Sequence, residues 1–374
     1  MNIFQRSTHS DRLERWLGSD HVNQISTSMK NWYGPPIGIG GVPGAVFACK
    51  GGDFRGPIKA GKLGNAYDFI RDRKKRIIRN WARDQQLSAA MGFTSLSDLI
   101  NEATIGGKSR YWPYNKSGST GVVGVTNSLW RLGPSPPVGA TPGNAAAGTA
   151  FDDSSTGGFP FTNPGSPDTQ HFVRGDASAS VIGNTLLLYD LIFGVNKTIN
   201  STATEAVTGV PTRYQSTTSS AQDYAGGNFL FVQVGGTPLA ATAHNWTVCT
   251  YKDQSGNAST LPSLVGNVSA IVDRLDHPVN QWFAPLETGD VGIQTLTQMQ
   301  CSALVATGVI WFMMGHPIVF MPIPAANIIC VTDGIMTAFN LTRIFDDACL
   351  AFLEVVKPST TATVYTGTFQ TVAG

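Results

Sequence analysis

Charged residues are scarce in this chain of 374 residues. They make up 14%, against the roughly 25% that is usual in globular proteins, whereas hydrophobic residues make up 42%. This balance excludes a disordered chain, which needs high charge and few apolar residues. It leaves an uncharged exterior rich in serine, threonine and asparagine, which guards poorly against association. We therefore expect much of the surface to be buried against other subunits.

Cysteine is sparse and unpatterned. The five cysteines are an odd number and contain no C-x-x-C pair, which argues against a zinc ribbon and against a dense disulfide framework. We expect buried free thiols at these positions: Cys49, Cys249, Cys301, Cys330 and Cys349.

Long hydrophobic runs are missing too. The most apolar stretch, Ala303–Met314, ends at Gly315-His316-Pro317, well short of the roughly 20 residues that span a bilayer. We expect a buried pair of strands here, with His316 in the turn between them, and no membrane contact. The first ten residues lack a basic head followed by an apolar run, so a secretory signal is not expected.

The motifs of common enzyme classes are incomplete. Residues Gly56–Leu63 have the spacing of a phosphate-binding loop, but Leu63 stands where serine or threonine would hold magnesium, and Pro57 removes a backbone N–H. The pairs Asp152-Asp153 and Asp346-Asp347 could suggest the two carboxylates of a glycosidase, but sequence neighbours point to opposite sides of a strand. Turn residues and a helix cap are the better interpretation.

Metal and nucleophile motifs do not occur either. There is no G-x-S-x-G elbow, and the histidines lie too far apart to propose a metal site. We expect no enzymatic activity, no cofactor and no metal. The histidines are His9, His21, His171, His244, His277 and His316.

Glycine and proline, by contrast, are frequent, with 41 and 21 residues. From Tyr111 onward, short apolar or alternating runs recur between clusters of Gly, Pro, Asn and Asp, which predicts many short strands in an antiparallel sandwich or jelly roll. The runs are Val122–Trp130, Leu186–Phe193, Phe229–Val234, Trp246–Tyr251, Val291–Met299, Val309–Met313, Ile318–Met321, Met336–Leu341 and Leu350–Val356.

The N-terminal third has a different pattern. Apolar spacings of three and four predict helices before Gly34 and over about 65–91, and Ser95 and Asp98 have the spacing of a helix cap. The sequence therefore predicts an α+β, mainly β fold: a basic, helix-rich docking region over 1–116, followed by a β-sandwich or jelly-roll-like domain over 117–374. Residues 133–167, dense in Gly, Pro, Ala and Ser, are expected to form a long loop or arm that a neighbouring subunit orders.

The formal net charge of +1 conceals a strong asymmetry. Residues 1–116 carry 18 Lys and Arg against 9 Asp and Glu, whereas residues 117–374 carry 8 against 16. The two parts of the chain are thus expected to meet different partners.

One basic segment, Asp68–Asp84, accounts for much of this charge. Apolar residues form one helical face, and basic residues recur at i+4 on another, where like charges oppose an isolated helix. An anionic partner would offset that cost, either packaged DNA or an acidic protein surface; a merely solvated face is the alternative. The apolar residues are Ile70, Ile77, Ile78 and Trp81, and the docking or DNA-contacting candidates are Arg71, Arg73, Lys74, Lys75, Arg76, Arg79 and Arg83.

The strand region contains tryptophans that have two interpretations. Trp246, Trp282 and Trp311 could form platforms that bind carbohydrate. Alternation places Trp246 with Val248 on one strand face, which is also what a sandwich core requires. The core is the favoured interpretation.

Several segments together resemble structural proteins of tailed bacteriophage particles. They are a strand that runs into a D-Q-x-G-N turn over Trp246–Asn257, then Pro285–Gly292, Gly308–Pro317, and the opening segments Leu13–Gly18 and Asn31–Pro36. The resemblance covers most of the chain and implies no catalytic residues. Proteins of this kind include capsid cement or decoration proteins, minor capsid proteins and tail components. A major capsid protein is disfavoured, because its usual fold needs a long spine helix and here the predicted helices are confined to the first third of the chain.

The resemblance implies a virion protein assembled in the bacterial host cytoplasm. The first hypothesis is a capsid cement, decoration or minor capsid protein that stabilises the shell, with the major capsid protein or other virion proteins, further copies of itself and packaged DNA as partners. The second is a tail or fibre protein with a glycan-binding β-sandwich. An enzyme that acts on polysaccharide is the third, and it depends only on the carboxylate pairs.

Overall fold

The computed structural model describes residues 95–374 except 161, 163, 166–167, 182–183, 217–226, 335–341 and 356–358. The chain divides into two compact units, Met1–Leu87 and Ser88–Gly374, and the described residues all belong to the second. The helices expected before residue 95, Cys49, the phosphate-like loop Gly56–Leu63 and the strand expected over Met336–Leu341 lie outside the described residues.

A short helix opens the described part. Helix α4 (Leu96–Asn101) begins at Ser95, whose Oγ accepts a hydrogen bond from the backbone N–H of Asp98 at 3.2 Å, as the capping spacing predicts. One π-helical turn, η3 (Glu102–Gly106), follows, and Gly107 ends it with φ of 73°, a conformation that favours glycine.

The unit is mainly β, and all pairings between its named strands are antiparallel, which confirms the coarse fold prediction. Sheet I has the order β14-β5-β17-β1-β3, sheet II the order β2-β16-β6-β13-β8, and sheet III the order β10-β9-β12-β7. Strands β15, β4 and β11 join β5, β6 and β9, respectively.

Sheet I contains β1 (Ser109–Ser117), β3 (Pro134–Ser135), β5 (Gln170–Ala179), β14 (Cys330–Asp333), β15 (Arg343–Ile344) and β17 (Val364–Ala373). Sheet II contains β2 (Asn127–Ser128), β4 (Thr149–Ala150), β6 (Asn184–Thr198), β8 (Phe229–Val234), β13 (Val309–Ile323) and β16 (Leu350–Val355). Sheet III contains β7 (Glu205–Ala206), β9 (Asn245–Asp253), β10 (Ala258–Thr260), β11 (Leu264–Val265) and β12 (Ile293–Cys301).

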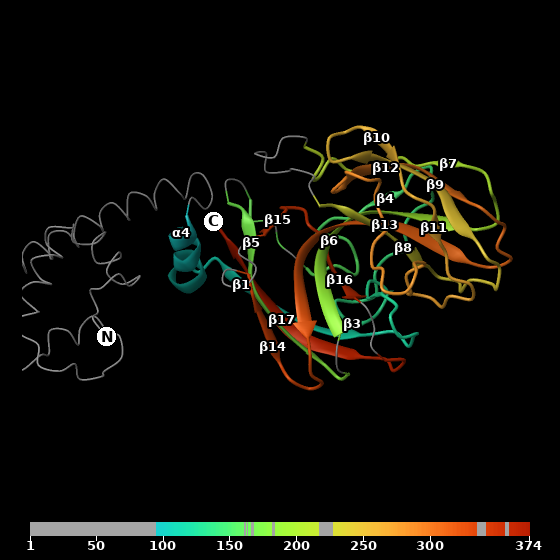
Figure 1. The fold of residues 1–374 in the computed structure, drawn as a ribbon. Coiled ribbons are helices and arrows are strands. Elements are labelled where there is room, and N and C mark those ends of the chain that lie inside the picture. The colour runs from blue at the N-terminus through green and yellow to red at the C-terminus, as the bar shows by residue number, and fades with distance from the viewer. Residues whose placement is uncertain are drawn as a thin grey trace, which may run out of the picture. The chain divides into compact units, whose positions relative to one another are not determined.

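Sheet II joins the other two sheets (Figure 1). Its strands β6 and β13 each have 15 residues and pair along their whole length, from Val309 opposite Thr198 to Ile323 opposite Asn184. On one face of β6, Leu186 and Leu188 pack against sheet I, whereas Ile192 further along packs against sheet III. The same strands therefore contribute to two separate hydrophobic cores.

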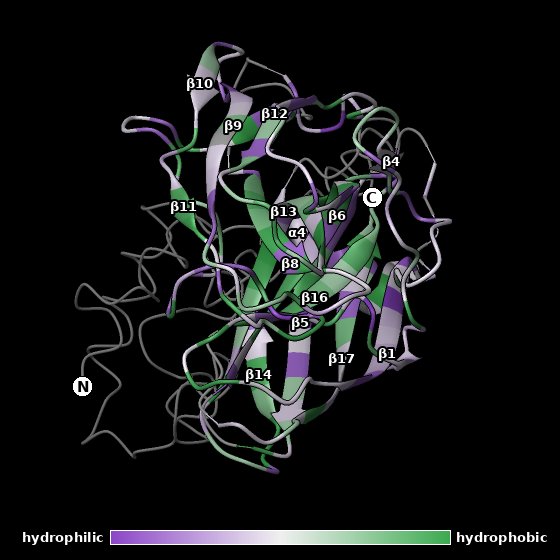
Figure 2. Cartoon of the chain, turned by 90° about the vertical axis from the view of Figure 1, so that its right-hand side faces the viewer, coloured by the Kyte–Doolittle hydropathy of each residue, from purple (hydrophilic) through white to green (hydrophobic). Residues whose placement is uncertain are grey.

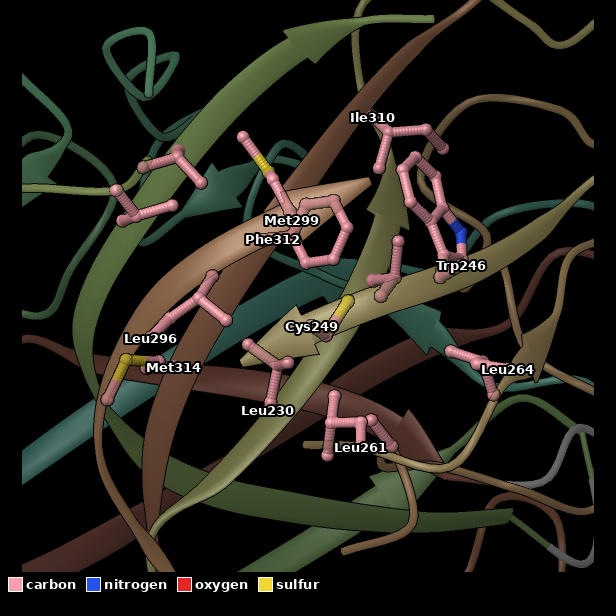
Figure 3. Packing of buried hydrophobic residues seen from close by; sticks show 14 of the residues in the cluster. Leu230, Trp246, Cys249, Leu261, Leu264, Leu296, Met299, Ile310, Phe312 and Met314 are labelled. Atoms are coloured by element: carbon pink, nitrogen blue, oxygen red, sulfur yellow. The ribbon is translucent and has the colours of Figure 1, made fainter. Parts of the chain in front are cut away.

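The core between sheets II and III is built from side chains of both (Figure 3). Trp246 lies edge-on to Phe312, with ring centroids 4.7 Å apart. Trp246 and Trp311 are fully buried, so the prediction that they belong to the core is confirmed. Cys249, Cys301 and Cys349 are buried free thiols as expected, whereas Cys330 on the edge strand β14 is half-buried.

One strand prediction was wrong in an informative way. Instead of two strands with a turn at Gly315-His316-Pro317, the chain forms the single strand β13. Register shifts after Met314 and after Pro317 absorb the irregular residues. The pairing with β8 ends at Gly315, so Pro317 lies where β13 pairs with β6 alone, which is the kind of position that tolerates proline in a sheet.

Other predicted runs match closely. Leu186–Phe193 lies within β6, Phe229–Val234 is β8, Trp246–Tyr251 lies within β9, Val291–Met299 overlaps β12, and Leu350–Val356 corresponds to β16. Val122–Trp130 is an exception, because only Asn127 and Ser128 form a strand there. Strand β1 crosses the boundary expected after residue 116.

The glycine- and proline-rich segment 133–167 packs on the sheets where it is described. It contributes β3 and β4, and its Phe151 and Phe159 are buried in two of the cores. The indole N–H of Trp130 donates to the carbonyl of Ala140 at 2.9 Å, which fastens the start of the segment. Of the two forms left open, loop and arm, residues 134–160 adopt a loop with aromatic anchors.

Candidate functional site

The basic residues chosen as docking candidates cannot be placed. Arg71, Arg73, Lys74, Lys75, Arg76, Arg79 and Arg83 all lie outside the described residues, so their role stays a prediction.

The carboxylate pairs are turn residues, as predicted. Asp152 accepts hydrogen bonds from the N–H of Ser154 at 3.0 Å and from the hydroxyls of Ser154 and Ser155, and these bonds, that of Ser154 above all, lower its pKa. Asp346 and Asp347 lie in the turn that the bond from Ala348 N–H to the carbonyl of Phe345 closes. Neither pair caps a helix, so that part of the prediction is wrong.

The described histidines are dispersed, and one of them is held in a buried network around Asp276. The carboxylate of Asp276 accepts hydrogen bonds from the indole N–H of Trp246 at 2.8 Å and from His244 Nε2 at 2.9 Å. The other ring nitrogen, His244 Nδ1, faces the carbonyl of Thr242. Burial alone would lower the pKa of His244, but the bond to Asp276 and its negative charge raise it. Within the described ranges, no three His, Cys, Asp or Glu side chains are grouped to hold a metal ion.

A second buried network lies at the seam between the two cores. Asp190 stands on β6 between Leu188 and Ile192, and its Oδ1 accepts from Arg213 Nη2 at 2.8 Å. Arg213 also donates to three backbone carbonyls, those of Phe151, Leu191 and Asp347. Burial raises the pKa of Asp190 although Arg213 opposes the shift.

The seam network extends to aromatic residues, and at Asn228 it reaches the wall of a surface hollow. His316 stacks on Tyr214 at 4.1 Å between centroids and donates from Nδ1 to Asn228 Oδ1 at 2.6 Å. Burial and, to a lesser extent, the positive charge of Arg213 lower the pKa of His316 to about 4. Asp190 and Arg213 are both buried, and their bonds join β6 to the segments around Phe151 and Asp347.

Sheet I has one face exposed to solvent. Alternate residues on its strands point inward to Phe369 and Tyr365, and the others face outward. Figure 2 shows this mixture of hydrophilic and hydrophobic residues along β1. The outward side chains are mostly polar and uncharged: Tyr111, Pro113, Asn115, Ser117, Arg174, Asp176, Ser178, Val364, Thr366, Thr368 and Gln370.

This sheet ends in an apolar edge. Within the described residues, strand β14 pairs only with β5. Ile328, Ile329 and Val331 are 57%, 68% and 52% exposed. The nearest charged residues are Asp333, which ends β14, and Asp176, which lies opposite Val331 on β5. Proteins usually protect open edges with charge or proline, because such edges pair with other strands.

A small aromatic hollow lies elsewhere on the unit. It has a cavity volume of about 180 Å³ and is lined by Phe229, Trp282, Phe283 and Val291 among others. Trp282 packs on Phe229, Phe283 and Phe320 with centroid distances of 4.9, 4.6 and 5.4 Å. Trp282 is half-buried and packs against the buried core around Phe229, so the core prediction holds for it in part.

Comparisons of the chain with family models, curated proteins and solved structures found no match. Within the described residues, no helix has both the length and the hydrophobicity needed to cross a membrane.

Proposed function

We propose that this chain is a structural protein of a tailed bacteriophage particle, of the capsid cement, decoration or minor capsid type. Its helix-rich, basic region over 1–116 docks on the particle, and its β-sandwich makes subunit contacts with the major capsid protein, other virion proteins or further copies of itself. The sequence resemblance supports this assignment. In this role the protein stabilises the particle through buried interface area and not through a catalysed reaction.

The observation that carries the proposal is the unprotected edge of sheet I. Ile328, Ile329 and Val331 expose apolar surface at strand β14, next to a sheet face whose outward side chains are mostly uncharged. A freely dissolved protein with this edge would associate non-specifically. In an assembled shell, a neighbouring subunit covers the edge and gains both its backbone hydrogen bonds and its apolar area.

Copy counting in purified particles tests the shell assignment. Quantitative mass spectrometry of intact particles should find this chain in hundreds of copies. A count of a few to a few dozen per particle would instead indicate a tail component, and absence from the particle would refute the proposal.

A substitution on the edge tests the surface. Val331→Lys places a charge on the open strand and should reduce incorporation into particles, because burial of an unpaired ammonium is costly. Val138→Lys is the matched control, since Val138 is equally exposed at 52% but lies in the loop segment. Equal incorporation of both variants would show that the edge does not make the contact.

The aromatic hollow favours a second candidate, a tail or fibre protein that binds glycans. Trp282 offers a half-buried ring on which a sugar face can stack, although the amide of neighbouring Asn228 is already bonded to Tyr214, Ile293 and His316. Binding to host glycans that Trp282→Ala abolishes, while Val138→Lys leaves it intact, would support this candidate over the first.

A further inference from the structure

One surface hollow of the unit contains an arginine that forms no ion pair within the described residues. The cavity measures about 310 Å³, within the range of small-ligand sites. Three separate segments line it, and they contribute Thr120–Val122, then Ser269, Ile271 and Arg274, and finally Thr360.

Arg274 is the charged group of this hollow. Its side chain is half-buried, its Nε is shielded from solvent without a hydrogen-bond partner, and burial lowers its pKa. No ion pair involves Arg274 in the part of the chain that the structure describes, whereas Arg131 and Arg213 lie beside Asp273 and Asp190. Asp276 attracts Arg274 through space, but its oxygens are bonded to His244, Trp246 and the N–H of Asn267.

The remaining lining supplies further donors and an apolar wall. The hydroxyls of Thr120, Ser269 and Thr360 are exposed and make no hydrogen bond within the described residues. Val122 and Ile271 expose apolar surface in the same hollow. Hydroxyls and a guanidinium are donors that suit an oxyanion, and the two aliphatic side chains suit an apolar body.

The backbone beneath the hollow holds these groups in place. The carbonyl of Arg274 accepts from Val234 N–H at 2.8 Å, and the next residue, Leu275, donates to the carbonyl of Thr126 at 3.0 Å. Ser269 N–H donates to the carbonyl of Ala240 at 3.2 Å, which fixes the other end of the segment. The site is thus formed before a ligand arrives, which limits the entropy lost on binding.

We propose that this hollow binds a small organic anion, with a carboxylate or phosphate head on Arg274 and the three hydroxyls and an apolar body against Val122 and Ile271. This goes beyond the proposed role in a particle and does not depend on it. An anion here supplies the counter-charge that Arg274 lacks, and charge-assisted bonds to a half-buried guanidinium are stronger than neutral ones.

Calorimetric titration of the full chain tests the site with four probes. Phenyl phosphate and benzoate carry a head and a body, inorganic phosphate carries a head alone, and phenol carries a body alone. We expect phenyl phosphate, benzoate or both to bind more tightly than phosphate or phenol, and the stronger of the two identifies the preferred head. Arg274→Gln should weaken that binding by about tenfold or more, since a bond to a charged group is lost. Arg174→Gln removes an equal charge from the exposed face of β5 and should leave binding unchanged.

A second variant keeps the test valid if Arg274→Gln fails to fold. Ile271→Glu changes an exposed side chain and places a carboxylate beside the guanidinium, so it should block binding while the melting temperature stays near that of the wild type. The proposal is overturned if neither phenyl phosphate nor benzoate binds at millimolar concentration, if phenol binds as tightly as the stronger of these two, or if Arg174→Gln weakens binding as much as Arg274→Gln.

Discussion

Buried polar side chains show most clearly how this unit uses single residues. Glu354, fully buried on β16, accepts from Asn127, Asn184 and Tyr365 and so joins segments from both ends of the unit. Each buried polar group needs a hydrogen-bond partner in the right place, because a buried donor or acceptor left without one costs about 1 to 3 kcal/mol. They therefore select one arrangement of strands among many that would bury the same apolar area.

Lys116 should make stability rise with pH in the alkaline range. Its buried ammonium donates to the carbonyl of Leu132, and burial lowers its pKa to about 8 from 10.5. Between these two values the unfolded chain holds the proton and the folded chain does not, so raising the pH favours folding. The urea midpoint of the wild type should increase from pH 8 to about 10.5, and Lys116→Met should remove that increase. An identical pH profile in the variant would contradict this assignment.

The ion pair at the seam should be costly to break. Arg213→Met leaves Asp190 buried without its partner and should cost about 3 to 5 kcal/mol of the free energy of unfolding. The loss should shrink in acid, since the raised pKa of Asp190 lets the carboxyl accept a proton. Urea unfolding of Arg213→Met and of the double variant Asp190→Leu/Arg213→Met measures this, and the double variant should be the more stable. If the double variant is less stable than Arg213→Met, the pair is not the reason for the loss.

Among the elements, β6 and β13 determine the architecture. Each is long enough to pack against sheet I at one end and sheet III at the other. The register shifts of β13 at Gly315 and Pro317 lie between these two regions and next to the Asp190 seam. Bulges bend strands and increase their twist, so this irregular stretch allows one strand pair to serve two cores.

Gly315 is required at this bend because a ring occupies the space of a side chain. A Cβ at Gly315 would lie 2.6 Å from Cδ2 of the buried ring of Tyr189. Gly315→Ala should therefore destabilise the protein by about 1 to 3 kcal/mol through overpacking. The control is Gly236→Ala, where the nearest atom is the flexible end of Arg131 at 4.0 Å. Thermal unfolding should separate the two variants, and equal melting temperatures would refute the packing argument.

For the whole molecule, the charge asymmetry predicts an electrostatic contact through the first part of the chain. Changing Arg71, Lys75, Arg79 and Arg83 to Gln should reduce incorporation into particles, and wild-type binding should weaken with salt as the Debye length falls from about 10 Å at 0.1 M to about 3 Å at 1 M. Circular dichroism should show unchanged strand content in the variant, because these residues precede the described sheets. Normal incorporation at every salt concentration would mean that the row is a solvated face.

The sequence located most strands whose two faces are buried, because their apolar runs are unbroken, as in Phe229–Val234. It did not locate β1, β5 and β17, since sheet I has a solvent face and its alternation includes Ser, Thr and Asn. The hollow around Arg274 had no sequence signal at all. A lone arginine gains meaning only when its neighbours are known to lack a carboxylate for it.

Local composition by itself determined that this chain forms a β-rich core with free thiols, a capped helix start at Ser95 and turns at its carboxylate pairs, because each depends on residues a few positions apart. Only the tertiary structure decided that the chain continues as one strand through Gly315-His316-Pro317, that Asp190 meets Arg213, and that Thr120, Arg274 and Thr360 share one hollow. These outcomes depend on which distant strands lie side by side. The period of a strand specifies which faces of it are apolar, but not the partner that covers them.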